Sequence, residues 1–165
     1  MEQHDILVTE PDMERLKSLL ASATRRLGKD KEHLETLEQE LDRVQTVSAY
    51  RVPKDVITMD SRVRVRELDT GEEKTYTLVF PWDADFAQGK ISVLAPIGTA
   101  ILGRRAGDVI EWHAPRGWKT LQVLKILYQP EAAGKASAEH RPRKRAVGSS
   151  RHPIPTLEPQ VYRAA

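Results

Sequence analysis

Arg62-Val63-Arg64-Val65-Arg66 is the stretch that decides the fold, because it alternates strictly between charged and apolar residues. Successive side chains of a β-strand point to opposite faces of the sheet. The alternation therefore predicts a strand with its valines in a core and its arginines in solvent. The residues before this strand have a helical period, and the residues after it continue in β-structure.

The residues that follow contain further strand patterns separated by turns. Predicted strands cover residues 75–80, 91–94, 109–113 and 121–128. Turn residues lie at 68–71 and 115–117, and a loop holds Asp83, Asp85 and Gly89. Residues 96–102 begin with proline and predict one or two helical turns. The pattern indicates an α+β chain whose β domain has several strands and one short helix.

Upstream of the strand, leucines recur at helical spacing in two runs. One run is Met13, Leu16, Leu20, Ala23 and Leu27, and the other is Leu34, Leu37, Leu41 and Val44. Spacings of three and four are typical of a coiled-coil seam. Thr9 is a suitable N-cap for the first helix, and Gly28 ends it. The sequence predicts a short antiparallel coiled-coil hairpin with helices of about 25 Å, which should lean on the next domain.

Charge divides the chain into three parts: 1–49 is a helical hairpin, 50–134 is a β domain and 135–165 is a disordered basic tail containing prolines. Residues 1–47 hold 7 Lys/Arg and 11 Asp/Glu, residues 48–134 hold 12 and 11, and residues 135–165 hold 7 and 2. The tail has no hydrophobic periodicity. The chain has no cysteine, its N-terminus is acidic, and no apolar stretch is long enough to span a bilayer. We therefore expect a cytoplasmic protein without a membrane segment.

Several separated stretches of the middle part resemble the GreA/GreB transcription elongation factors. They are Val56 to Val63, Ser92 to Gly103, and Ala106-Gly107-Asp108. The ending from Val123 to Gly134 is similar to the Rnk-type members of that family. The resemblance covers residues 5–134, and its motifs occur in the family's order. The tail departs from typical Rnk-type chains, which end near the position of Gly134.

The resemblance implies an FKBP-like fold for residues 50–130, which is a twisted antiparallel sheet wrapped on a short helix. It also implies binding to RNA polymerase, on its largest subunit near the secondary channel. In cleavage-stimulating members a longer hairpin enters this channel, and two acidic residues at its tip help hold Mg²⁺. Rnk-type members have a shorter hairpin and are thought to dock without stimulating cleavage. The resemblance therefore favours a regulator that competes with Gre-type factors and is not an enzyme.

The loop at residues 96–103 is the expected polymerase contact. The candidates are Pro96, Ile97, Gly98, Thr99, Arg104 and Arg105. The alternative is that the apolar residues of this loop fill the core of the sheet, which we expect for Ile101 and Leu102. Contact and purely structural roles are equally balanced, and the contact role rests on the resemblance.

The hairpin tip holds Asp30 and Glu32. Two acidic residues there could be Mg²⁺ ligands for transcript cleavage. The simpler interpretation is that Asp30 caps a helix and Glu32 complements the helix dipole. Lys29 and Lys31 would repel a cation, and a helix of about 25 Å is too short to reach a buried active centre. We therefore expect no metal at the tip.

Two basic clusters complete the candidate sites. Arg62, Arg64 and Arg66 share one strand face, which Arg104 and Arg105 could extend, although a solvated face is the more common explanation. The tail segment contains Arg141, Arg143, Lys144 and Arg145, which could bind nucleic acid, DNA included, weakly and without specificity. The alternative is a solvated end of the chain.

The sequence contains no P-loop, no Ser/His/Asp set and no dinucleotide fingerprint, and its histidines lack metal-ligand spacing. We expect no catalytic residue and no cofactor. The three tryptophans are predicted to pack in or beside the core. A prolyl isomerase or peptide-binding module is a further hypothesis, but it rests on the FKBP-like fold alone, and the sequence reveals no aromatic-lined pocket.

Overall fold

A computed structural model describes residues 5–23 and 31–134 of the chain. Its order of elements is β1 (Leu7–Thr9), α1 (Glu10–Ala23), α2 (Lys31–Leu41), β2 (Gln45–Val47), β3 (Arg62–Glu67), β4 (Glu73–Val79), β5 (Lys90–Ser92), α3 (Pro96–Ile101), β6 (Val109–Ala114) and β7 (Gly117–Tyr128). Two 3₁₀ turns, Pro81–Asp83 and Phe86–Gln88, lie between β4 and β5. The predicted α+β class is confirmed.

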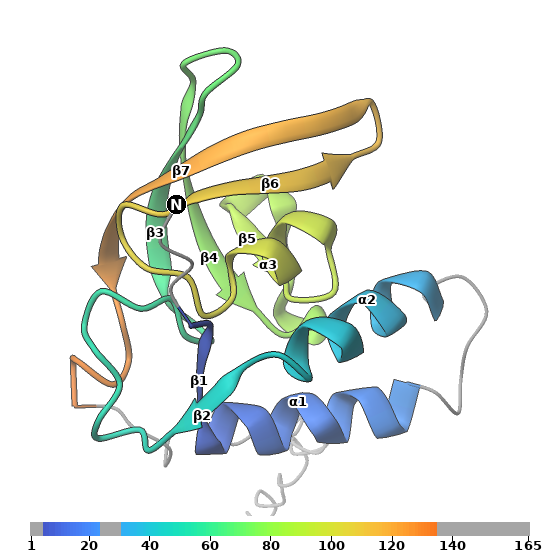
Figure 1. Cartoon of the computed structure of the whole chain (residues 1–165), viewed down its shortest axis with the longest axis vertical. Coiled ribbons are helices and arrows are strands. Elements are labelled where there is room, and N and C mark those ends of the chain that lie inside the picture. The colour runs from blue at the N-terminus through green and yellow to red at the C-terminus, as the bar shows by residue number, and fades with distance from the viewer. Residues whose placement is uncertain (1–4, 24–30, 135–165) are drawn as a thin grey trace, which may run out of the picture.

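The main sheet has the order β5-β4-β3-β7-β6 and curls around α3 (Figure 1). The predicted alternation in β3 is confirmed, because Val63 and Val65 are buried while Arg62 and Arg64 are exposed. The prediction of a wholly antiparallel sheet is wrong, because β5 pairs parallel to β4. The connection through the two 3₁₀ turns carries the chain back along β4 to a point opposite Thr77, so that β5 runs in the same direction as β4.

The small helix of the β domain is held by two glycines. A Cβ atom on Gly98 would lie 2.0 Å from the backbone oxygen of Ser92, so only glycine lets α3 approach β5 this closely. Gly103 has φ +74°, and a Cβ atom there would meet Leu7 of β1. Ile101 and Leu102 are buried in the core, as predicted. The loop from 96 to 103 is therefore a packed junction between the sheet, α3 and the N-terminal strand.

The N-terminal helices differ from the prediction in length and in packing. Thr9 caps α1 as expected, because its hydroxyl oxygen accepts a hydrogen bond from the Asp12 N–H at 3.3 Å. The described residues give α1 14 residues and α2 11 residues, and α2 ends at Leu41, before the predicted Val44. The residues after Leu41 form β2, which pairs in parallel with β1, and neither strand was predicted. β-branched Thr46 and Val47 favour this extended conformation.

The coiled-coil seam is only partly realised. Leu34, Leu37 and Leu41 of α2 are buried as predicted, but α1 buries Leu19 where the seam predicted Leu20. Leu20 and Leu34 line a cavity of about 370 Å³ between the two helices, so the seam does not interlock there. Leu27 and the predicted break at Gly28 lie outside the described residues. The FKBP-like assignment stays a prediction.

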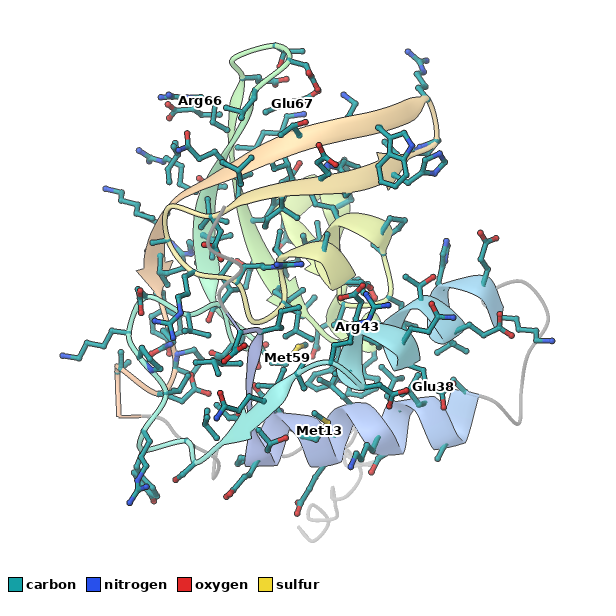
Figure 2. The ribbon with its side chains drawn as sticks, viewed as in Figure 1. Met13, Glu38, Arg43, Met59, Arg66 and Glu67 are labelled. Carbon is teal, nitrogen blue, oxygen red and sulfur yellow. The ribbon has the colours of Figure 1, made fainter. Side chains whose placement is uncertain are left out.

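The helices and the sheet share one hydrophobic core. It joins Met13, Leu16 and Leu37 of the helices to Met59 and to the valines of β3. Figure 2 shows Met13 and Met59 at the contact between α1 and the β domain. α2 lies between α1 and α3 (Figure 1). The helices therefore lean on the β domain as predicted, and the division into residues 1–49 and 50–134 stays a prediction.

Candidate functional site

A buried charged group fixes the helices on the β domain. Asp12 is 2% exposed, and its Oδ2 atom accepts a hydrogen bond of 3.1 Å from the Met59 N–H. The other carboxylate oxygen accepts a hydrogen bond from Arg15. The Arg15 guanidinium lies 4.9 Å from the centre of the Phe80 ring, which stacks on Trp82. This chain of contacts sets the position of α1 relative to the sheet.

The end of the β domain holds the linker that joins it to the helices. The side-chain amide of Gln129 donates hydrogen bonds of 2.8 Å to the backbone oxygens of Pro53 and Val56. The Thr58 hydroxyl donates a 2.7 Å hydrogen bond to Glu131. These contacts give a physical role to the residues after β7, which the sequence marked only by resemblance.

A groove lies between α2, α3 and the β6–β7 hairpin, with a volume of about 410 Å³. We call it the α2–α3 groove. It brings together Glu32 of α2, Pro96 and Thr99 of α3, and Arg104. Three carboxylates line it, those of Glu32, Glu40 and Glu111. The groove thus connects the base of the predicted tip with part of the predicted polymerase contact.

The six predicted contact residues occupy different environments. Pro96 is exposed at the start of α3, whereas Ile97, Gly98 and Thr99 are buried. The Thr99 hydroxyl donates a hydrogen bond of 2.6 Å to the Val93 oxygen, which ties α3 to the end of β5. Pro96, Arg104 and Arg105 therefore offer the accessible surface, while the buried three hold the backbone of α3 in place.

The two arginines after α3 have partners. Arg104 Nε donates to the Ala100 backbone oxygen at 3.3 Å. Arg105 lies 3.8 Å from the carboxylate of Asp55, and its backbone N–H donates to Asp108 at 2.8 Å. Part of the positive charge of Arg105 is therefore neutralised, whereas Arg104 lines the α2–α3 groove.

The predicted hairpin tip is described only in part. Glu32 is exposed in the first turn of α2, where a carboxylate complements the helix dipole. Asp30 lies outside the described residues, as do Arg141, Arg143, Lys144 and Arg145 of the tail. Within residues 5–23 and 31–134, no group of three His, Asp or Glu side chains is placed to hold a metal ion. No helix in this part of the chain is long and apolar enough to span a membrane.

The outer face of the sheet carries the predicted arginine stripe. Arg62 and Arg64 are exposed, and Arg64 lies directly opposite Lys125 of β7. Arg66 pairs with Glu73 at 2.5 Å, and this hydrogen bond lowers the pKa of the Glu73 carboxyl. Figure 2 shows Arg66 and Glu67 on opposite sides of β3. The stripe is therefore positively charged at Arg62 and Arg64, whereas the charge of Arg66 is balanced by Glu73.

A second cavity, which the sequence did not reveal, lies on the concave side of the sheet. Its volume is about 310 Å³. Tyr76, Phe86, Trp112 and Pro115 line it, together with apolar Val65, Ile97 and Leu121. We call it the aromatic pocket. The sequence does not reveal this pocket, because its aromatic residues meet only when β-strand alternation places Tyr76 and Trp112 on the same side of the curled sheet.

The tryptophans are distributed between surface and interior. Trp82 and Trp118 are 51% and 73% exposed, so neither lies in the core, but Trp82 stacks on buried Phe80 beside the core, as the prediction allowed. Trp118 instead contacts His113 edge-on at 5.2 Å near the tip of the β6–β7 hairpin. Trp112 is partly buried and lines both the aromatic pocket and the α2–α3 groove.

Comparison with known proteins shows which family has this sequence and architecture. Residues 52–128 match the family model described as transcription elongation factor, GreA/GreB, C-term, and residues 5–47 match the Rnk N-terminus. The regulator of nucleoside diphosphate kinase from Escherichia coli (strain K12) is 48% identical over 101 residues, which cover 61% of this chain and 74% of that protein. Transcription elongation factor GreA from Nitratidesulfovibrio vulgaris (strain DSM 19637 / Miyazaki F) is 32% identical over 108 residues, covering 66% and 68%.

A solved structure agrees with these matches. The GreA/GreB elongation factor from Nitrosomonas europaea superposes with a TM-score of 0.62 at 38% identity, covering 75% of this chain and all of that chain. Fold and sequence together define a regulator of the transcription-elongation-factor class. The chain belongs to the GreA/GreB family and carries the Rnk-type N-terminus.

Proposed function

We propose that this chain is a regulator that binds RNA polymerase at the rim of the secondary channel and competes there with Gre-type factors. The contact is made by the β domain with the largest subunit, and the chain itself does not stimulate transcript cleavage. Membership of the family supports the choice of partner. The observation that carries the rest is the packing of two short helices against the β domain.

The helices limit how far an acidic group can extend from the docking surface. With 14 and 11 residues, α1 and α2 are about 21 and 17 Å long. Both contribute to the core of the β domain, so part of this length lies alongside the sheet rather than beyond it. The described helices therefore support a unit that obstructs an entrance rather than one that carries a metal ion deep into a channel.

The accessible residues around the start of α3 form the proposed docking surface. Pro96 is exposed and Arg104 lines the neighbouring groove. Buried Gly98 and Thr99 keep the backbone of α3 fixed against β5. A rigid backbone reduces the entropy lost on binding, which favours a contact at this place.

Competition with a cleavage factor tests the proposal. Polymerase is halted in a backtracked complex, a GreA-type factor is added, and RNA cleavage is measured while this protein is titrated. Cleavage should fall as the chain saturates the polymerase. The double variant Pro96→Ala/Arg104→Ala should require at least a tenfold higher concentration, which corresponds to about 1.4 kcal/mol. Glu14→Ala, on the exposed side of α1, is the matched control. Unchanged cleavage at saturating protein would exclude competition.

The alternative is that the chain stimulates cleavage through Asp30 and Glu32. The same backtracked complex without a GreA-type factor distinguishes the two functions. We expect no cleavage above the level of polymerase alone. Cleavage that appears with the natural chain and disappears with Glu32→Ala or Asp30→Ala would establish the alternative.

The basic tail is proposed to add only weak nucleic-acid binding. Deleting Arg141, Arg143, Lys144 and Arg145 should lower the affinity for nucleic acid and reduce the dependence of that affinity on salt concentration.

A further inference from the structure

The aromatic pocket has two features that internal packing does not explain. Phe86 lines the pocket and is 77% exposed, although burying a phenylalanine is favourable by about 2 kcal/mol. The indole Nε1 of Trp112 is buried, and no acceptor for its N–H lies among residues 5–23 and 31–134. A buried polar group without a partner is costly. Both features fit a ligand that brings an apolar surface and a hydrogen-bond acceptor.

The residues that line the pocket also indicate the chemistry of its ligand. Tyr76 is buried enough that desolvation raises the pKa of its phenol. Four of the charged residues at the wall are paired, Glu67 with Lys119 and Glu72 with Lys74, and Arg116 also lines the pocket. The remaining surface is aromatic or aliphatic. Aromatic walls with a tryptophan N–H are how protein grooves recognise proline-containing segments, whose carbonyls carry no internal hydrogen bonds.

We propose that the occupant is the end of this chain's own tail, residues 151–162, with its prolines against Tyr76, Phe86 and Trp112. This segment reads Arg-His-Pro-Ile-Pro-Thr-Leu-Glu-Pro-Gln-Val-Tyr and holds three prolines together with aliphatic residues. Its carbonyl oxygens supply the acceptor for the Trp112 indole. The pocket volume of about 310 Å³ lies at the lower end of the range for ligand sites, about 300–1,000 Å³.

Charge favours the same occupant. Residues 135–165 hold seven Lys/Arg and two Asp/Glu, a net of +5. The α2–α3 groove shares Trp112 and Pro115 with the aromatic pocket, and it is lined by three carboxylates and one arginine. A basic segment that enters across this groove meets complementary charge before its prolines meet the aromatic walls.

The connecting segment is long enough. Nineteen residues lead from Gly134 to Pro153, and an extended chain of this length spans up to about 60 Å. A globular unit of roughly 120 residues has a radius of gyration of about 14 Å. The segment can therefore pass from the end of the described chain to any point on its surface. This inference does not depend on the proposed function, because it concerns contacts within the chain.

Nuclear magnetic resonance of the full chain tests the proposal through the indole N–H of Trp112. The signals of Trp82, Trp112 and Trp118 are assigned with single Trp→Phe variants. The variant Pro153→Ser/Pro155→Ser/Pro159→Ser should shift the Trp112 signal and accelerate its hydrogen exchange at least tenfold. Adding a synthetic peptide of residues 151–165 to this variant should restore the original signal. The control His140→Ala/Ser149→Ala/Ser150→Ala should leave it unchanged.

Cross-linking provides an independent readout. A photoreactive benzoylphenylalanine in place of Tyr162 should link to peptides that contain Phe86 or Trp112, and the link should be lost in Phe86→Ala. The same group at Val147 should not reach them. An unchanged Trp112 signal in the proline variant, or links spread without preference over the surface, would overturn the proposal. Links that form only between two chains, with a yield that rises with concentration, would overturn the intramolecular arrangement.

Discussion

The β domain and the N-terminal helices bury their apolar residues by different rules. In β3 the alternation of the sequence is the alternation of the structure, because a strand has two faces and one of them is covered. In α1 the heptad pattern predicts Leu20, yet the structure buries Leu19. A helical repeat shows which side of a helix is apolar, but it does not show what covers it. Here the cover is α2 on one side and the β domain on the other.

The contact between the two regions also differs from the interior of either one. The sheet is closed by apolar packing around Val63, Val65 and Val123. The junction adds a buried charge, because Asp12 accepts hydrogen bonds from Met59 and Arg15. A hydrogen bond to a charged group constrains the direction between donor and acceptor as well as their distance. Asp12 therefore determines how α1 lies on the β domain.

The largest expected effect comes from breaking this contact. Asp12→Ala leaves the Met59 N–H and the Arg15 guanidinium without the carboxylate that they both contact. We expect the free energy of unfolding to fall by about 4 kcal/mol, since removing one partner of a buried charge pair costs roughly 3–5 kcal/mol. Urea unfolding followed by tryptophan fluorescence and by helical circular dichroism measures it.

Asp12→Asn is the matched control, because an amide oxygen still accepts from the Met59 N–H but carries no charge. It should lose clearly less stability than Asp12→Ala. If helices and sheet unfold together in the natural chain, the two signals coincide, and Asp12→Ala should separate them. Equal stability of Asp12→Ala and the natural chain would mean that the two regions are not joined at this residue.

The next effect separates the two interpretations of α1. Leu19 is 8% exposed, whereas Leu20 is half-buried beside the cavity between the helices. Leu19→Ala should cost about 3 kcal/mol, within the range for buried leucines, and Leu20→Ala about 1 kcal/mol. Chemical denaturation of both variants gives the comparison. A larger loss for Leu20→Ala would restore the coiled-coil seam that the sequence predicted.

This difference between strands and helices explains which parts of the fold the sequence predicts. The strands of the main sheet, the short helix at 96–102 and the Thr9 cap could be predicted, because each depends on a local pattern. The pairing of β1 with β2 could not, since three-residue strands have no period and pair only because the helices between them return. The parallel pairing of β5 depends on the path of the loop at 80–90, whose mixture of aromatic and acidic residues has no regular period.

The candidate sites show the same limit. The loop at 96–103 could be found from its glycines and proline, and its buried Ile101 and Leu102 were predicted, but the burial of Ile97 and Thr99 was not. The aromatic pocket needs Tyr76, Phe86 and Trp112, which come from three separate elements. Alternation predicts the inner face of each strand, but the curl of the sheet decides which residues meet.

A smaller effect is expected at the linker between the two regions. Gln129 is 3% exposed, and its amide donates to the Pro53 and Val56 oxygens. Gln129→Met keeps the volume but removes both donors, which should cost about 2 kcal/mol because two backbone oxygens lose their partner. Hydrogen exchange should rise first in residues 52–58. Uniform exchange across the chain would show that Gln129 stabilises the whole core rather than the linker.

The smallest effect concerns the outer face of the sheet and contrasts with Asp12. The Arg66 hydrogen bond lowers the pKa of Glu73, and Arg64 adds a weaker Coulombic attraction. In Arg66→Gln the pKa of Glu73 should rise towards its ordinary value, and in Arg64→Gln it should rise less, as carboxyl NMR titration would measure. A lowered pKa stabilises the fold above the ordinary pKa, and this contribution is lost as pH falls through the pKa of the folded state. Because Glu73 lies in solvent, salt should weaken the shift, whereas the buried Asp12 contact should persist. A salt-independent shift at Glu73 would contradict this distinction between the surface of the β domain and its junction with the helices.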